Sequence, residues 1–329
     1  MGFLTGTKIG QMLLALIAFA AVIAVLLLIA RLADRLKGEK SRQTIIVSVF
    51  VGPALIFLAF GLIYPAIRTI YMSFFDRRTD VFVGLSNYQW VFTNAESVRG
   101  LINTFWWVLL VPTLSTGIGL LYAILVDKAR FEKYAKSLLF LPMAISFVGA
   151  SIIWRFVYDF RAAGQRQIGI LNAVITGAGG EPIRFLQDSP ANTFYLIVVM
   201  VWIQAGFAMV LLSAAIKAIP DDIIEAARLD GVNAWQMFAK ITVPSIRPTL
   251  VVVLTTIGIS TLKIFDITRT MTGARFNTQV LANLMYDQSF TFGNNGVGSA
   301  LAVVIFVLVI PIVMFNIRQM LKNREVRGA

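Results

Sequence analysis

Seven long apolar stretches, separated by charged segments, dominate the pattern of hydrophobic and polar positions along the chain. A membrane-spanning helix needs about 20 mostly apolar residues, and each stretch meets or nearly meets that length. The sixth stretch is interrupted by Lys263 and is expected to continue to about Ile267. The stretches are residues 12–30, 43–67, 101–126, 137–154, 189–216, 248–267 and 294–317. The pattern predicts an all-α, polytopic membrane bundle of about seven transmembrane helices.

The composition supports a membrane protein: 58% of the 329 residues are hydrophobic and 14% are charged, against about one quarter charged in soluble domains. Because the chain has no cysteine and no histidine, disulfides, thiolate nucleophiles and ordinary zinc sites are excluded, and no metal or cofactor site is expected. The net charge of +12 would suggest nucleic acid in a soluble protein. Here Lys and Arg lie between the apolar stretches, which indicates loops that face anionic membrane lipid and no nucleic-acid partner.

The basic residues also predict the orientation. With the N-terminus outside, the inner segments hold 17 of the 29 Lys and Arg residues although they are shorter than the outer segments; they are residues 31–43, 127–136, 217–247 and 318–329. The positive-inside rule therefore favours an external N-terminus and a cytoplasmic C-terminus. The first stretch is not expected to be a cleaved signal peptide, because its flanking charges follow the apolar run and no small-residue cleavage site is present.

Three parts are expected along the chain. Residues 1–42 form an additional N-terminal transmembrane helix with a basic linker, residues 43–320 form a six-helix membrane domain, and residues 321–329 form a basic cytoplasmic tail. The outer segments are long enough to be functional. Within one of them, residues 168–175 fit a short amphipathic helix at the outer surface.

The segment 218–246, between the fifth and sixth stretches, predicts a short helix that begins and ends sharply. Pro220 followed by Asp221 and Asp222 is typical of a helix start, because proline suits the first turn and carboxylates suit the positive end of the helix dipole. Gly231 is expected to end this helix, since glycine accepts the left-handed conformation of a C-terminal cap.

A second short helix is expected from about Ala234 to Lys240, stopped by Pro244. Two short amphipathic helices joined by a glycine turn would form a rigid knob suited to docking into a groove on another protein. An ordinary loop lying on the membrane surface would show similar amphipathicity. The apolar side of the first helix is expected to contain Ile223, Ile224, Ala227 and Leu229.

The same segment resembles the EAA loop of ATP-binding-cassette (ABC) import permeases. The family pattern is Glu-Ala-Ala, three residues, Gly, nine residues, Ile, one residue, a branched apolar residue and Pro. A chance match of six such residue types in a chain of this length is on the order of a few in 100,000. The matching residues are Glu225-Ala226-Ala227, Gly231, Ile241 and Val243-Pro244, with Val243 where the family often has Leu.

Other segments extend the resemblance to about residues 45–320. They are residues 50–55 with 64–66, residues 84–88, and residues 265–267 with 271–273. The chain is most similar to the maltose/α-glucoside and glycerol-phosphate types of permease, which pair with a second, similar subunit. The resemblance implies a multi-pass protein of the bacterial cytoplasmic (inner) membrane. It would form half of the pathway for a sugar or oligosaccharide by alternating access, with an α-glucoside such as maltose, trehalose or sucrose as the expected solute.

The implied partners are a second homologous permease subunit, an ABC ATPase dimer that binds ATP and Mg, and an extracytoplasmic solute-binding protein. This chain contains no Gly-x-x-x-x-Gly-Lys-Ser/Thr motif, so it is not expected to hydrolyse ATP itself. In the implied complex the loop docks in a cleft of one ATPase, where Glu225 makes an ion-pairing or capping contact and Gly231 fixes the turn. Ala226 and Ala227 permit close approach. The implied coupling residues are Glu225, Ala226, Ala227, Asp230, Gly231, Ile241 and Pro244.

The resemblance also implies that the helices before and after the loop face the solute. A sugar site needs hydroxyl-binding groups and an aromatic face, and the candidates are Trp202, Gln204, Phe207, Ser260 and Thr261. Packing between membrane helices is the alternative explanation for such residues. Lys263 and Asp266 are expected to form a structural pair rather than a solute site, because they lie three residues apart.

Three further functions stay open from the sequence. The same machinery could carry glycerol phosphate or a polyamine, although a charged solute would call for matching charges on helices five and six, where few occur. A membrane-embedded enzyme would need convergent titratable groups, and the one acidic doublet is better explained as a helix start. A partner-free secondary transporter or channel would not need the loop pattern.

Overall fold

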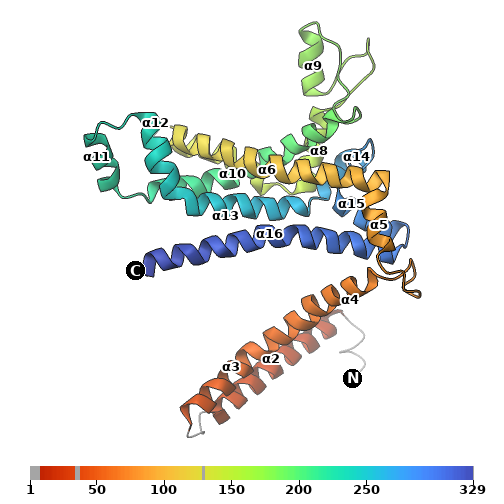
Figure 1. Cartoon of the computed structure of the whole chain (residues 1–329), viewed down its shortest axis with the longest axis vertical. Helices are drawn as coiled ribbons and strands as arrows, with labels where there is room; N and C mark the ends of the chain where they lie inside the picture. The colour runs from red at the N-terminus through yellow and green to blue at the C-terminus, as the bar shows by residue number, and fades with distance from the viewer. Residues whose placement is uncertain (1–7, 34–37, 128–129, 329) are drawn as a thin grey trace. The chain divides into compact units, whose positions relative to one another are not determined.

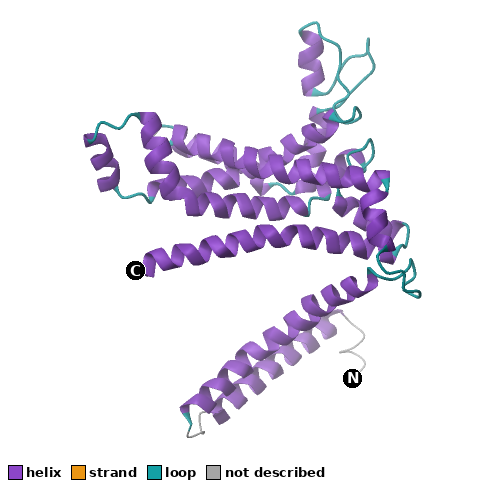
Figure 2. Cartoon of the chain, in the orientation of Figure 1, coloured by secondary structure: helices purple, strands orange, loops and turns teal. Residues whose placement is uncertain are grey.

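The computed structural model describes residues 8–33, 38–127 and 130–328. By backbone contacts the chain divides into two compact units, Met1–Thr69 and Ile70–Ala329. The described residues form helices and one isolated bridge between Phe75 and Phe82, with no extended strand (Figure 2). Six helices are long and apolar enough to cross a membrane, or seven when one bent pair of helices is counted as a span. The predicted polytopic α-helical bundle is therefore confirmed.

The first unit is built from two long apolar helices that pack against each other (Figure 1). Helix α2 (Lys8–Ala33) contains the first predicted span. Helix α3 (Glu39–Leu58) continues through the π-helical turn η1 (Ala59–Ile63) into α4 (Tyr64–Met72), so that the second span is unbroken.

The second unit contains the remaining helices, among which α10 is the most deeply buried span. Its elements in chain order are α5 (Ser86–Thr93), α6 (Ala95–Val126), α7 (Glu132–Phe140), η2 (Leu141–Ala144), α8 (Phe147–Val157), α9 (Ile170–Gly177), α10 (Ala191–Lys217), α11 (Asp221–Leu229), α12 (Ala234–Gln236), η3 (Met237–Thr242), α13 (Val243–Leu262), α14 (Asp266–Thr272), α15 (Leu281–Tyr286), η4 (Asp287–Thr291) and α16 (Asn295–Gly328). Helix α10 contacts α6, α7 and α13. Two thirds of the residues in its most apolar segment are buried inside the protein.

A glycine allows α6 and α10 to approach closely. A Cβ atom at Gly119 would lie 2.6 Å from the Cβ of Ala208 and 2.7 Å from the backbone nitrogen of Met209. Small residues at such contacts are typical of membrane helices, where association depends on close packing rather than on the exclusion of water. The buried core around this contact includes Trp107, Leu196, Met200 and Leu212.

The fourth apolar stretch differs from the straight span expected at residues 137–154. The chain bends by 105° between the helical segments Glu132–Ala144 and Phe147–Val157. Pro142 lies in the first turn of η2, and the Ser146 hydroxyl accepts a hydrogen bond from Gly149 N at 3.1 Å. Apolar length reveals neither feature: Pro142 is compatible with a new helical turn, while the serine cap begins a separate helix.

The sixth stretch also differs from the prediction at its end. Helix α13 ends at Leu262, and Lys263 forms its C-cap; the expected continuation to Ile267 is wrong. The carbonyl of Phe265 is instead satisfied by the Thr268 hydroxyl at 3.0 Å and the Asn283 amide at 3.4 Å, so this break leaves no unpaired carbonyl there. Lys263 follows the end of α13 and Asp266 begins α14, so the two residues do not share a helix, and the expected pair does not form among the described residues.

Two other elements lie near their predicted positions. The short helix expected at residues 168–175 is α9, Ile170–Gly177. The buried Asn172 amide ties it down by donating to Asp159 O and Ile183 O, both at 2.9 Å. The last span is part of α16, which runs on to Gly328, so the predicted tail is a continuation of the helix. The orientation and the domain boundaries at residues 42 and 320 stay predictions.

Candidate functional site

The loop after α10 carries a helix, α11, whose ends are those expected from the sequence. Pro220 precedes it and Asp221 and Asp222 lie in its first turn. At the C-terminal end, Val232 N donates to Ala227 O at 3.2 Å and Gly231 N donates to Arg228 O at 3.1 Å. These two bonds, with Gly231 at φ 75°, form a Schellman cap, in which the left-handed residue is usually glycine. The predicted start and stop of this helix are confirmed.

The two alanines of the Glu-Ala-Ala sequence have different surroundings. Ala227 is buried, with 6% of its surface exposed, whereas Ala226 is exposed. Ile224 is half-buried against the hydrophobic core. Ile223 and Leu229 are exposed, Leu229 by 89%, so they do not belong to the packed side of α11 as expected. The inner side of α11 is therefore narrow and consists of Ile224 and Ala227.

The second half of the loop is not a separate short helix. The Asn233 side chain caps α12, accepting from Gln236 N at 2.8 Å, while the Gln236 side chain accepts from Asn233 N at 3.0 Å. From α12 the chain continues through π-helical η3 into α13, giving one apolar helix over Ala234–Leu262. Pro244 does not stop it, because the wide π turn just before this proline accommodates its missing N–H and its ring. The expected two-helix knob is thus one short helix, α11, beside the end of a spanning helix.

The exposed residues of this loop form what we term the coupling surface, defined as Glu225, Ala226, Leu229, Asp230 and Trp235. Glu225 and Leu229 lie four residues apart and share one side of α11. The Glu225 side chain makes no hydrogen bond or ion pair with any described residue. Trp235 is 71% exposed and packs on Phe238, with ring centroids 5.5 Å apart. Exposed large apolar side chains such as Trp235 and Leu229 are features of protein-docking surfaces, and tryptophan is enriched among the residues that dominate binding.

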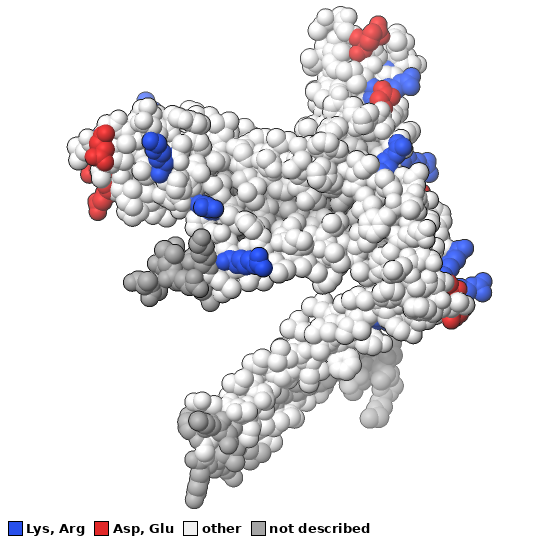
Figure 3. Space-filling model, in the orientation of Figure 1, with Lys and Arg blue, Asp and Glu red and all other residues white. Residues whose placement is uncertain are grey.

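The coupling surface lies at one end of the bundle, where α11 and α12 project (Figure 1). Acidic side chains gather over α11 on the face shown in Figure 3, and basic side chains lie nearer the helical bundle on the same face. Two other loop residues implied by the family pattern, Ile241 and Pro244, lie outside this surface as defined. Ile241 is half-buried in η3, and Pro244 is exposed in the first turn of α13. Sequence analysis singled out neither Trp235 nor the exposure of Leu229.

The five solute-path candidates do not converge on one cavity. Trp202 packs edge-on against Trp154, with centroids 5.7 Å apart, and lines an apolar cavity of about 390 Å³ beside α7 and η2. Gln204 is two residues from Trp202, so it projects to nearly the opposite side of α10. Phe207, three residues after Gln204, lies on the same side as Gln204. Thr261 is fully buried and its hydroxyl donates to Ile257 O at 2.7 Å, as in helix packing. Ser260, like Gln204 and Phe207, is half-buried.

A larger cavity, of about 900 Å³, lies at the opposite end of the second unit from the coupling surface. Arg269 donates to both oxygens of Asp287, at 2.9 and 3.1 Å. Both residues line the cavity, together with Arg155, Arg184 and Arg275. These arginines come from segments far apart in the sequence and were counted only as outer charges, so sequence analysis missed the cavity.

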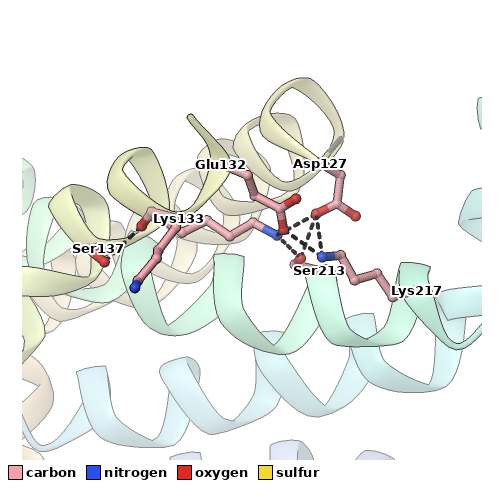
Figure 4. Close-up of polar contacts among 7 residues, drawn as sticks. Asp127, Glu132, Lys133, Ser137, Ser213 and Lys217 are labelled. Atoms are coloured by element: carbon pink, nitrogen blue, oxygen red, sulfur yellow. Dashed lines mark hydrogen bonds and ion pairs between the residues drawn. The ribbon is translucent and has the colours of Figure 1, made fainter. Parts of the chain in front are cut away.

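A cluster of charged and hydroxyl side chains joins the ends of α6, α7 and α10 next to the coupling loop (Figure 4). We term it the polar anchor: Asp127, Glu132, Lys136, Ser213 and Lys217. The Glu132 carboxylate lies 2.7 Å from Lys136 Nζ and 2.5 Å from Lys217 Nζ. Ser213 Oγ donates to the Asp127 carboxylate at 2.9 Å. Lys136 Nζ also donates to the Asp127 carboxylate and to the Ser213 hydroxyl.

Comparison with known proteins places the chain in a family. The sequence profile described as "Binding-protein-dependent transport system inner membrane component" matches residues 101–327. The chain is 50% identical over 279 residues to the osmoprotective compounds uptake permease protein GgtC of Synechocystis sp., a match that covers 85% of this chain and 100% of that relative. It is also 50% identical over 271 residues to the alpha-glucoside transport system permease protein AglF of Rhizobium meliloti, with 82% of this chain and 81% of the relative covered.

The fold is shared with a solved structure. A chain in the crystal structure of a bacterial ABC transporter involved in the import of the acidic polysaccharide alginate superposes with a TM-score of 0.74 at 21% identity, covering 85% of this chain and 96% of that chain. The helical bundle, the extent of the profile match and the identity to two transport permeases agree with one another. The chain therefore belongs to the binding-protein-dependent transport system inner membrane components, the permease subunits of ABC importers.

Proposed function

We propose that this chain is one of two permease subunits of an ATP-driven importer for a sugar, and that its solute is an α-glucoside or a related small glycoside. The 50% identity to a permease named for alpha-glucoside transport carries the choice of solute. The relative named for osmoprotective compounds is equally similar, so both solute classes belong in the first assay. The subunit lies in the cytoplasmic membrane with its N-terminus outside, as the distribution of Lys and Arg favours.

The coupling surface is the observation that carries the mechanism. ATP and Mg bind to a partner ATPase, and closure of the ATPase dimer moves the loop that docks on it. Glu225 is an unpaired carboxylate on the exposed side of α11, and Trp235 and Leu229 supply apolar contact area. Tryptophan is among the residues that contribute most to binding in protein interfaces. Ala226 is small and exposed, which allows a partner to approach the backbone of α11 closely.

The solute passes between this subunit and a second, similar permease after delivery by an extracytoplasmic solute-binding protein. The alginate importer with the same fold has been crystallised with such a periplasmic protein. Gln204 and Phe207 share one side of the central helix α10 and are the strongest candidates for solute contact. Thr261 is a weaker candidate because its hydroxyl is buried and already bonded to its own helix.

The test is ATP hydrolysis and solute uptake by the complete complex in nanodiscs or proteoliposomes, with binding protein and with candidate α-glucosides and compatible-solute glycosides. Two variants address the coupling surface. Glu225→Ala removes the unpaired carboxylate, and Gly231→Pro imposes a φ near −65° where the native φ is 75°. Glu181→Ala, at an exposed carboxylate in the segment after α9, is the matched control.

We expect solute-stimulated ATP hydrolysis to fall strongly in both loop variants and to stay at the wild-type level in Glu181→Ala. The solute that stimulates hydrolysis and enters the vesicles identifies the transported class. If no ATPase subunit co-purifies under mild conditions, or if both loop variants couple normally, the assignment of this loop as the ATPase contact is wrong. A complex that responds only to a charged solute would overturn the choice of a neutral glycoside.

A further inference from the structure

One side of α10 contacts both halves of the bent fourth span. Trp202, Gly206, Ser213 and Lys217 are spaced by four, seven and four residues, so they share one side of the helix. Trp202 contacts Trp154 of α8. A Cβ at Gly206 would lie 2.5 Å from Leu139 O, so this glycine lets α7 touch the backbone of α10.

The polar anchor completes this contact at the end of α10. The Asp127 side chain is only 9% exposed and the Lys136 side chain 19% exposed, and among the described residues the two carboxylates contact two ammonium groups. Lys136 Nζ contacts Asp127, Glu132 and Ser213 of the cluster, whereas Figure 4 shows the ammonium group of Lys133, on the same helix, directed away from it. Removing one member of such a cluster leaves a charge with fewer partners in a partly desolvated site. This energetic cost favours the one arrangement of α6, α7 and α10 in which all five side chains meet.

The anchor lies immediately before the coupling loop in the chain. Lys217 is the last residue of α10, and α11 begins at Asp221. The connection between them is tied by bonds from Ala218 N to Ala214 O at 3.1 Å and from Ile219 N to Ile216 O at 3.2 Å. Ile219 is buried, with 9% of its surface exposed. A displacement of α11 is therefore transmitted to the end of α10 rather than absorbed by a flexible linker.

A cavity lies beside the bend of the fourth span. The cavity of about 390 Å³ lies beside the 105° bend and is lined by Leu138, Leu141, Pro142 and Ile145 from the bent span and by Trp202 from α10. Side chains around a bend can repack into such a space without opening the helix contacts on either side. The bent span is thus anchored at one end, close-packed in its middle and adjacent to a cavity at its bend.

We propose that the polar anchor makes α7 move with the end of α10, so that motion of the coupling loop reaches the bent fourth span and the solute path. Asp127, Glu132, Lys136, Ser213 and Lys217 act as positioning residues: they touch neither ATP nor solute. This inference rests on the proposed docking of the coupling surface on an ATPase. The anchor holds α7 and α10 as one body, and the bend at residues 145–146 supplies the hinge.

The first test compares Lys136→Gln with Lys133→Gln in the complete complex. Both remove one ammonium group from α7, but only the first breaks the anchor. We expect Lys136→Gln to keep ATPase association and hydrolysis while solute moved per ATP falls by about five-fold or more, the lower range of typical coupling between sites. Lys136→Arg, which keeps the charge, should restore most of the ratio. Equal ratios in Lys136→Gln and Lys133→Gln would overturn the proposal.

A second measurement does not depend on a disruptive variant. The chain contains no cysteine, so within this subunit spin labels at Lys133→Cys and Ala218→Cys report only on α7 and the end of α10, and the partner subunits are used in cysteine-free form. In the complex with an unaltered anchor, the distance between these labels should stay constant between the nucleotide-free and ATP-bound states. A distance that changes with nucleotide would refute the anchor even if Lys136→Gln failed to assemble. Loss of all ATPase association would instead count against the proposed function.

Discussion

Gly119→Ala is the sharpest test of the central packing. Gly119 lies where α6 meets α10, and an added methyl carbon would lie 2.6 Å from the Cβ of Ala208, 2.7 Å from Met209 N and 3.0 Å from Ala205 O. Two of these atoms belong to the backbone, so no side-chain rotation relieves the contact. Gly117, two residues earlier on α6, has no atom within 4 Å of its would-be Cβ. The two glycines therefore form a matched pair on one helix.

The size of the effect follows from these distances. Non-bonded carbon atoms prefer separations of about 3.5–4.0 Å, so α6 and α10 must separate locally by about 1 Å, which removes about a quarter to a half of the attraction between facing atoms. Overpacking of this kind costs about 1–3 kcal/mol. The higher helix propensity of alanine returns up to about 1 kcal/mol. With the full return, the net expectation is a loss of about 0–2 kcal/mol for Gly119→Ala, and no loss for Gly117→Ala.

The assay is reversible unfolding of the purified chain in mixed SDS and detergent micelles, followed by tryptophan fluorescence. Gly119→Ala should unfold at a lower SDS fraction than wild type, and Gly117→Ala at the same or a higher fraction. If Gly119→Ala is as stable as Gly117→Ala, then α6 and α10 do not approach as closely as described, and the placement of α10 at the centre of the core loses its main support.

Three further predictions concern separate parts of the chain. Trp235→Ser should weaken binding of the purified ATPase to the pair of permease subunits by about 2 kcal/mol, as for an aromatic interface anchor. The measurement is the dissociation constant of the ATPase, which should rise while the pairing of the two permease subunits is unchanged. Asn283→Leu should cost about 1–3 kcal/mol in the same SDS assay, because the buried hydroxyl of Thr268 loses its 2.6 Å partner. The backbone N–H groups of Val81 and Asp80 lower the pKa of the Asp76 carboxyl from its usual 3.8. This turn should therefore be fully stabilised above pH 3.8 and lose its bonds as pH falls through the lowered pKa. Hydrogen exchange at the Val81 amide, expressed as protection relative to the intrinsic rate at each pH, should fall across that range, and constant protection would contradict the prediction.

The number and type of helices could be predicted because apolar length alone specifies a membrane span. The ends of α11 could be predicted as well, since Pro220 and Gly231 act within a few residues of themselves. The break at residues 145–146 could not, because a proline and a serine that begin a new helix also occur inside continuous membrane helices. The same ambiguity made Pro244 look like a stop signal, whereas a preceding π turn accommodates it.

Side-chain placement was predictable only where it follows from helical periodicity. Ile224 and Ala227 face inward as expected, but Leu229, at the last turn of α11, lies beyond the surface that the bundle covers. Trp202 and Gln204 were grouped by their chemistry although two residues of separation place them on opposite sides of α10. The polar anchor joins residues up to 90 positions apart, and no local pattern in the sequence indicates which of the many charges pair.

The close contact at Gly119 has a consequence for biosynthesis. Its counterpart, Ala208, is synthesised about 90 residues later, which at about 5–20 residues per second is a delay of about 4–18 s. During this delay α6 is already in the membrane, and the surface that α10 will cover is open to lipid or to the insertion machinery. The hydroxyl groups of Ser115 and Thr116 on α6, which have no hydrogen-bond partner among the described residues, are also uncovered by α10 during this delay. Slow elongation between the two helices would prolong the period in which quality-control proteases meet an unpaired α6.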